Sequence, residues 1–235
     1  MVDQIGDGQV GAETVATNGG PAVPRTDQMS MTDMVYARLR EEILTVRRKP
    51  GVVLRESDLA EAHEVSKTPV REALRLLARD GLVVLLPRKG YLVRPLELND
   101  LREIFDARQV LEPAMAERAA RARRPLALDE LVDRQTDAAS SAEALQAARE
   151  FHLAIADMAG NSRLTLALAN LLDEVRRLHY LLPEVEAHIA SQEELQAHHR
   201  LIVALQAHDG EQASALMREH ISEVARALAR GFSGF

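Results

Sequence analysis

The chain begins its patterned part with two helical segments separated by a strong stop. An apolar stripe at helical spacing predicts a first helix over about 33–47, and Pro50-Gly51 ends it. A second, short helix is expected over 57–63, with Ser57 as its N-cap. The stripe that the first helix would bury consists of Met34, Val35, Leu39, Ile43, Leu44 and Val46.

A third helix and a hairpin follow directly. The helix opens at Ser66 or Lys67, tolerates a proline in its first turn and ends at Gly81. Two apolar runs, 82–86 and 91–93, predict strands joined by a turn that carries glycine where a positive φ is tolerated. Three helices followed by such a hairpin predict a winged helix-turn-helix, in which the third helix is free to enter the major groove of DNA.

The rest of the chain has only helical periodicity. The expected helices cover about 100–123, 127–138, 142–159, 162–181, 191–208 and 210–230, with breaks at proline, glycine and asparagine. In the first of them, Leu101, Ile104, Phe105, Val110, Leu111 and Met115 are expected to be buried. The prediction is a mainly α protein: a flexible tail (1–28), a winged helix-turn-helix domain with a small β-hairpin wing (29–96), and an all-helical antiparallel bundle of six to seven helices (97–230).

Composition narrows the class of protein. The chain has 235 residues, with 46% hydrophobic and 3% aromatic residues, which suits helices with a sizeable core. The absence of cysteine excludes disulfides and thiolate metal sites. No apolar run is long enough for a signal peptide or a membrane span. We therefore expect a soluble, cytoplasmic protein with no membrane partner.

Charge is divided unevenly along the chain. The net charge of −7 comprises −3 in residues 1–30, −8 from residue 95 onward, and +4 in residues 31–94, where 13 Lys and Arg meet 9 Asp and Glu. A basic module followed by an acidic one points to an anionic partner for the basic part.

The basic residues of the third helix suit DNA. Lys67, Thr68, Arg71 and Arg75 are expected on its exposed, N-terminal side, and Arg88 and Lys89 lie at the tip of the wing. The planar fork of arginine can bind guanine or phosphate through two hydrogen bonds. The alternative is a solvated helix face paired with Glu72 and Asp80, but the order of helices and hairpin favours DNA.

The segment "LRESDLAEAHEVSKTPVREALRLLARDGLVVLLPRKGYLV" resembles the DNA-binding domain of the GntR family of bacterial transcription regulators. The resemblance implies that Arg71 is the arginine that reads the operator and that Arg55 lies near a further contact. Lys67 stands where many members carry arginine, and a lysine suits a phosphate better than a base. The expected DNA contacts are Arg55, Ser66, Lys67, Thr68, Arg71, Arg75, Lys89 and Gly90.

Three helices of the bundle each carry one histidine within an apolar stripe: His152, His199 and His220. A buried imidazole without a partner costs about 1–3 kcal/mol, so each should have one. The residues alone leave two interpretations open: separate, satisfied core histidines, or convergence on a metal or an anion. The remaining histidines are expected at the surface: His63, His179, His188, His198 and His208.

The bundle is similar to the FCD domain, the C-terminal ligand-binding domain of the FadR subfamily. The similar segments are "FDARQVLEPAMAERAA", "EFHLAIADMAGN", "AHHRLIVALQAHDGEQA" and "MREHI". Many such domains bind zinc or nickel through three histidines and an Asp four residues before the first, and the cation helps to hold a small carboxylate. The resemblance implies His152, His199 and His220 as metal ligands, and these three with Arg108 and Asn161 as effector contacts.

The Asp of that pattern is replaced by Ala148. Three imidazoles and an open position would still suit Zn²⁺ or Ni²⁺, with water or an effector carboxylate completing the site. The alternative is that the three histidines and Arg108 bind an organic acid directly, without a metal.

Two functions are compatible with these features. The first is a ligand-responsive regulator that binds double-stranded operator DNA as a homodimer and is switched by a small organic acid. The second is a three-histidine metal-dependent hydrolase with an accessory nucleic-acid-binding domain, which would need a general base beside the metal. Glu150 falls off the buried stripe and Glu112 belongs, by resemblance, to the first helix of the pocket, so no such base is expected and an enzyme is disfavoured.

Overall fold

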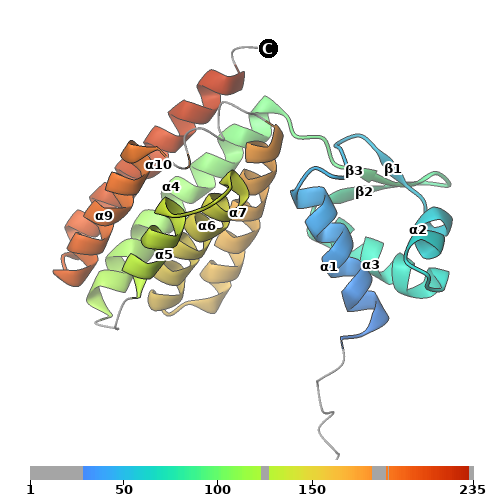
Figure 1. Ribbon diagram of the computed structural model, residues 1–235, viewed down its shortest axis with the longest axis horizontal. Helices are drawn as coiled ribbons and strands as arrows, with labels where there is room; N and C mark the ends of the chain where they lie inside the picture. Colours follow the sequence, from blue (N-terminus) through green and yellow to red (C-terminus); the bar gives the residue numbers. More distant parts are fainter. Residues whose placement is uncertain (1–28, 123–126, 182–188, 190, 233–235) are drawn as a thin grey trace, which may run out of the picture.

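The computed structural model describes residues 29–122, 127–181, 189 and 191–232, arranged as two adjoining helical domains (Figure 1). The predicted tail over 1–28 lies outside the described residues. The first domain contains three helices, α1 (Met31–Leu44), α2 (Glu56–Ala62) and α3 (Lys67–Arg79), and three strands, β1 (Val53–Leu54), β2 (Val83–Leu86) and β3 (Gly90–Val93). The strands form one antiparallel sheet in the order β1-β3-β2.

Local signals explain most helix boundaries of this domain. A capping box formed by Ser30 and Asp33 starts α1, Ser66 precedes α3, and Gly81 follows α3 with a φ of +77°. The predicted start of the second helix is wrong: α2 begins at Glu56 with Arg55 at the N-cap position, and the hydroxyl of Ser57 donates to Asp58. Ser57 therefore lies inside the first turn.

The sheet contains one strand more than the predicted hairpin. Val53 and Leu54 pair with Leu92 and Tyr91 of β3. A strand of two residues is too short to show a period of two in the sequence. Its approach to the wing requires Gly90, which has a φ of +113° and at which a Cβ would lie 2.3 Å from the carbonyl oxygen of Leu54.

The core of this domain is the predicted one except at two positions of the first stripe: Met34 is 48% exposed, and Val46 lies beyond the end of α1 and outside the core cluster. The helical stripes of α1 and α3 meet the inner face of the sheet and are almost fully buried. Members of this cluster are Val35, Leu39, Ile43, Leu44, Val70, Ala73, Leu74, Leu77, Tyr91 and Val93. The exposed side of α3 is left for other contacts.

The second domain is helical in all described residues, as predicted (Figure 1). Its six described helices are α4 (Leu98–Arg121), α5 (Leu128–Thr136), α6 (Ser141–Met158), α7 (Ser162–Leu181), α9 (Gln192–Gln206) and α10 (Gly210–Phe232). One predicted core residue is wrong: Val110 is 73% exposed. At about 100° per residue, it lies about half a turn around α4 from Leu101, opposite the buried stripe.

The two domains meet where α1 packs beside α7 (Figure 1). Arg176 of α7 makes a two-pronged ion pair with Glu41 of α1, at 2.7 and 2.9 Å. The buried Arg177 donates to the backbone carbonyl of Arg94, at 2.7 Å, in the segment that leads from the wing to α4. No helix among the described residues is long and apolar enough to cross a membrane.

Candidate nucleic-acid interface and metal centre

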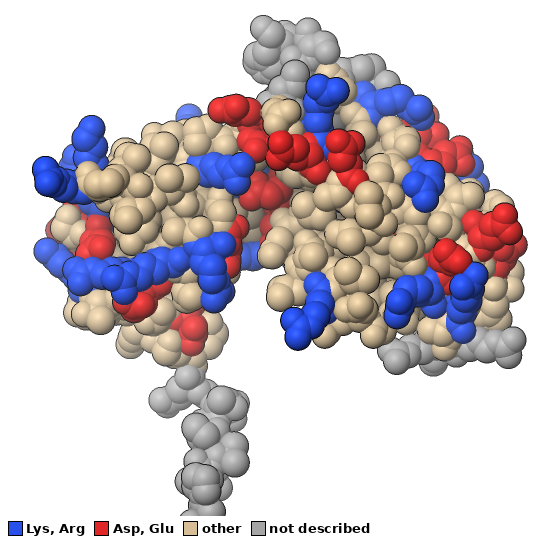
Figure 2. All heavy atoms as spheres, turned by 180° about the vertical axis from the view of Figure 1, so that it is seen from behind, with Lys and Arg blue, Asp and Glu red and all other residues tan. Residues whose placement is uncertain are grey.

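A concave basic surface lies between α3 and the wing. Its lining includes Arg55, Lys67, Arg71, Lys89 and Gly90, which are five of the eight predicted DNA contacts, together with Arg88. Basic side chains form a band across the lobe on the left of Figure 2, which is this domain seen from behind. Ser66, which precedes α3, and Thr68 and Arg75 on α3 are exposed but lie outside this concave surface.

Arg71 is held in place by an acidic neighbour. Its Nε lies 3.0 and 3.1 Å from the two carboxylate oxygens of Glu56, at the start of α2. The side chain of Arg71 is 48% exposed, so a phosphate or guanine can approach it. Arg75 pairs with Glu72 one turn further along, at 2.8 Å. Glu56 therefore sets the direction of Arg71 across the concave surface in the absence of DNA.

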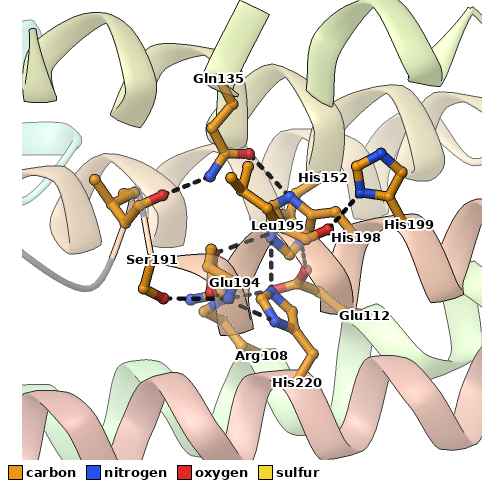
Figure 3. Close-up of polar contacts among 11 residues, drawn as sticks. Arg108, Glu112, Gln135, His152, Ser191, Glu194, Leu195, His198, His199 and His220 are labelled. Atoms are coloured by element: carbon orange, nitrogen blue, oxygen red, sulfur yellow. Dashed lines mark hydrogen bonds and ion pairs between the residues drawn. The ribbon is translucent and has the colours of Figure 1, made fainter. Parts of the chain in front are cut away.

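Three buried histidines converge in the centre of the helical domain. His152 of α6, His198 of α9 and His220 of α10 are each no more than 4% exposed. One ring nitrogen of each lies within 4.8 Å of the others (Figure 3). The Nε2 atoms of His152 and His220 are 3.2 Å apart. The predicted convergence is present, but one of its members differs from the prediction.

The assignment of His199 to this cluster is wrong. Its side chain is exposed, and its ring Nδ1 donates to the backbone carbonyl of Leu195 on its own helix, at 2.8 Å (Figure 3). The neighbouring His198, expected at the surface, is fully buried. His179, also expected at the surface, is 7% exposed and bonds the carbonyl of Val175, while His188 lies outside the described residues.

Two of the three rings are fixed by neighbouring side chains. The amide of Gln135 donates to the carbonyl of Ile189, so its oxygen accepts from Nδ1 of His198, at 2.9 Å. Glu112 accepts from Nδ1 of His152, at 2.5 Å. In both rings, Nε2 is left with its lone pair directed toward the cluster.

The carboxylate that bonds to His152 also belongs to a buried ion pair, between Arg108 and Glu112. The other oxygen of Glu112 accepts from Nε of Arg108, at 2.5 Å, and both side chains are at most 2% exposed. Burial alone would raise the pKa of Glu112, but its interactions with Arg108 and His152 outweigh burial and hold the pKa well below its usual range. Glu112 is thus an ionised carboxylate beside a histidine, which corrects the expectation that no core-facing carboxylate lies near the cluster.

A second buried carboxylate was also not predicted from the sequence. Glu194 of α9 is 6% exposed, with one oxygen 3.6 Å from Nε2 of His198 and the other 3.7 Å from Nδ1 of His220. Burial lowers the pKa of His198 well below its ordinary value and lowers the pKa of His220 to about 4, against the opposing charge of Glu194. Both rings are therefore neutral near pH 7, the form in which imidazole binds a metal.

The cluster borders a small cavity of about 30 Å³. Arg108, Ala148, Arg149, His152, Glu194 and His220 are among its lining residues. A space of this size holds about one water molecule or a metal ion. Asn161, predicted to contact an effector, lies elsewhere: its side-chain oxygen accepts from the backbone amides of Arg163 and Leu164, which caps the start of α7.

The donor set fits a divalent transition-metal ion. Nε2 of His198 is buried and makes no hydrogen bond within the described part of the chain. A buried polar atom without a partner costs free energy, and a bound metal ion would provide that partner. Two nitrogens bound to one Zn²⁺ at ~2.0–2.1 Å are separated by ~3.0–3.4 Å at ordinary coordination angles, and His152 and His220 already have that spacing. His152, His198 and His220 are thus the residues that would hold the ion.

Arg149, at the wall of the cavity, is linked to the DNA-binding domain. Its Nε donates to one oxygen of Asp173 on α7, at 3.1 Å, and the other oxygen of Asp173 accepts from Arg40 of α1. Asp173 is 4% exposed. One buried carboxylate therefore joins a residue of the cavity to a helix of the winged domain. No sequence motif predicts this connection.

Comparison with known proteins assigns both domains. Residues 31–93 match the model of the bacterial regulatory proteins of the gntR family, and residues 103–223 match the FCD domain. The chain belongs to the GntR family and carries an FCD domain. It is accordingly a DNA-binding transcriptional regulator of the helix-turn-helix type.

Individual proteins also resemble this chain over nearly its whole length. The transcriptional repressor RspR of Escherichia coli K12 is 27% identical over 222 residues, which cover 92% of this chain and 93% of RspR. The structure of E. coli McbR/YncC superposes with a TM-score of 0.74 at 25% identity, covering 87% of this chain and all of that one. A GntR transcriptional regulator from Rhodococcus sp. RHA1 gives a TM-score of 0.70 at 26% identity, covering 88% of this chain and all of the other.

Membership of the GntR family decides against the hydrolase hypothesis. The expectation that the protein is not an enzyme is confirmed, but the reason for it was wrong. Glu112 and Glu194 are buried carboxylates near the histidines. The sequence motifs do not show that Glu112 lies near the histidines, because it belongs to α4, a helix distant in sequence from all three of them.

Proposed function

We propose that this regulator binds operator DNA as a homodimer and that a small organic acid, held at the three-histidine cavity, controls the binding. The observation that carries the proposal is the position of Asp173, which is bonded both to Arg149 at the cavity and to Arg40 of α1. A ligand that competes for Arg149 changes the partners of Asp173 and hence the contact between the domains.

In the DNA complex, α3 enters the major groove and the wing lies over the adjacent backbone. Arg71 reads a base, while Arg55, Lys67 and Lys89, which line the same concave surface, bind phosphates. Ser66, Thr68 and Arg75, which are exposed outside this surface, contact the flanking backbone. Two copies of the domain on a two-fold axis would match a pseudo-palindromic operator, which is the reason to propose a homodimer.

The metal, zinc or nickel, would be held by the Nε2 atoms of His152, His198 and His220. When bound, it supplies a Lewis-acidic centre that an effector carboxylate can approach. The chain's own residues supply the surrounding positive charge: Arg108 behind His152 and Arg149 at the cavity wall. Because the free cavity has the volume of about one water, an organic acid must displace lining side chains. An incoming carboxylate can replace Asp173 as the partner of Arg149.

The proposal is tested by a thermal-shift screen of organic acids, with and without Zn²⁺ or Ni²⁺, followed by gel shifts on the DNA that flanks the gene. An acid that binds the native state raises the melting temperature and should change operator affinity at the same concentration. Specific binding should weaken steeply as salt increases, because phosphate contacts release counterions. If no acid in a broad panel shifts both melting and operator affinity, the effector part of the proposal is wrong.

Replacing Arg108 by glutamine should remove the thermal shift that the selected acid causes, while operator affinity without the acid stays within a factor of about 2. Arg108 lines the cavity but contacts no residue of the winged domain among the described contacts. The variant loses the charge opposite Glu112, so circular dichroism must first show that it folds. A full thermal shift in the folded variant would place the acid elsewhere.

Replacing Asp173 by asparagine should separate binding from response. The acid should still raise the melting temperature, but operator affinity should change less than about 2-fold on its addition, because Arg149 and Arg40 no longer share a carboxylate. Asp157→Asn makes the same change at an exposed carboxylate on α6, in the same domain; it is the matched control and should retain the response. An undiminished response in Asp173→Asn would rule out this connection as the route of coupling.

A further inference from the structure

Glu194 occupies an unusual position for a residue at the start of a helix. Ser191 is the N-cap of α9, and its hydroxyl accepts from the backbone amide of Glu194, three residues later. In α1 and α4, the acidic residue at this third position turns back to its own N-cap backbone. The carboxylate of Glu194 instead lies inside the domain, among the histidines (Figure 3).

The helix positions this carboxylate toward the metal cluster. Glu194 and His198 are four residues apart on α9, so their side chains share one face. The two oxygens of Glu194 lie 3.6 Å from Nε2 of His198 and 3.7 Å from Nδ1 of His220. Nε2 of His198 is the same buried atom that makes no hydrogen bond within the described residues. One carboxylate thus faces two of the three proposed ligands.

The charges of the site favour an anionic ligand here. The other buried carboxylate of the cluster, Glu112, already accepts from Arg108 and His152 with its two oxygens. Imidazole ligands supply no negative charge, so three of them leave the charge of a divalent ion uncompensated in a buried site, which is energetically costly. Position 148, one turn before His152 on α6, could also present a carboxylate to the cavity but is alanine.

We propose that Glu194 is the anionic ligand of the metal site, which then consists of three histidines and one carboxylate drawn from α6, α9 and α10. This inference rests on the proposed metal site but assigns a residue that the histidine motifs do not contain. It implies that a cation draws the start of α9 toward α6 and α10, because Glu194 and His198 both belong to α9.

The test is competition titration of the full chain, expressed without a histidine tag, with Zn²⁺, and absorption spectroscopy with Co²⁺ as a coloured substitute. Glu194→Gln should weaken Zn²⁺ binding by at least about 10–100-fold, the loss typical even of outer partners of metal ligands. It should also change the Co²⁺ spectrum, which reports the donor atoms. The neighbouring Glu193→Gln, whose side chain is exposed, should change neither.

A second variant distinguishes the loss of a carboxylate ligand from a general structural effect of Glu194→Gln. Ala148 lines the same cavity, so Ala148→Asp should restore Zn²⁺ affinity in the Glu194→Gln background if the lost contribution is a carboxylate ligand. Parent-like affinity in Glu194→Gln would overturn the inference while leaving the three-histidine site intact. Weaker binding with an unchanged Co²⁺ spectrum would also overturn it, because Glu194 would then only orient His220. Failure of the parent protein to bind Zn²⁺ would instead refute the proposed metal site itself.

Discussion

Alanine in place of Arg71 should abolish the discrimination between operator and unrelated DNA while leaving the fold intact. A bidentate contact to guanine is worth about 1–3 kcal/mol, or roughly 5–150-fold in affinity. In a dimer, the loss is incurred at both half-sites. Because the Arg71 side chain is 48% exposed and belongs to no core cluster, the melting temperature should change little.

The geometry around Arg71 makes this the largest effect expected in the winged domain. Arg71 lines the concave surface between α3 and the wing together with Lys67, Arg88 and Lys89. Glu56 holds the guanidinium through two oxygens, so its direction is set before DNA arrives. DNA must displace or share this ion pair. Since the pair is exposed to solvent, breaking it costs less free energy than a bidentate hydrogen bond to guanine provides.

Fluorescence anisotropy with operator and scrambled duplexes at a fixed salt concentration measures the effect. Arg102→Ala removes an exposed arginine from α4, in the other domain, and should leave both affinities unchanged. Arg71→Lys keeps the charge but loses the fork, so it should retain non-specific binding and lose much of the discrimination. Operator binding by Arg71→Ala as tight as the parent's would show that α3 is not the reading helix.

The winged domain could be predicted well because its signals are local. Pro69 in a first turn and glycines at positions 81 and 90 mark boundaries that backbone geometry enforces. The elements that escaped prediction are defined by distant partners. Val53 and Leu54 are a strand only because Tyr91 and Leu92 pair with them.

The cavity was less predictable, because several of its residues are joined across helices distant in sequence. Glu112 bonds to His152, which lies 40 residues later in the sequence. Asp173 bonds to Arg40, 133 positions away, and to Arg149, 24 positions away. Charged residues inside helices are ordinarily solvated. Without the positions of the neighbouring helices, nothing distinguishes Glu194 or Asp173 from an exposed acid.

The choice between His198 and His199 shows how a periodic pattern misleads. Leu195, Ile202 and Leu205 fit a stripe that includes either histidine at a spacing of three or four. The buried arc of α9 is wider, and also includes Glu194, Ala197, Leu201 and Ala204. At about 100° per residue, its centre lies about 30° from His198 and about 130° from His199. The full width of the arc, visible only in the fold, decides the assignment.

These neighbouring histidines provide the sharpest test of the metal centre. His198→Ala should remove near-stoichiometric Zn²⁺ or Ni²⁺ from the protein, because it deletes the Nε2 atom that faces the cluster. His199→Ala should retain the metal, since its ring is exposed and bonded to its own helix. Both variants remove the same chemical group, from adjacent positions. Elemental analysis of protein expressed without a histidine tag measures the difference directly.

Loss of a buried ring could also unfold the domain, and His198→Gln addresses this possibility. Glutamine keeps a polar side chain of similar length beside Gln135 but lacks the imidazole nitrogen, so it should preserve the helical spectrum and still lose the metal. With the fold retained, loss of metal in His198→Gln and His198→Ala but not in His199→Ala can come only from the cluster. If His199→Ala lost the metal and His198→Gln retained it, the ligand would be His199 on the exposed face of α9, and the buried site would be refuted.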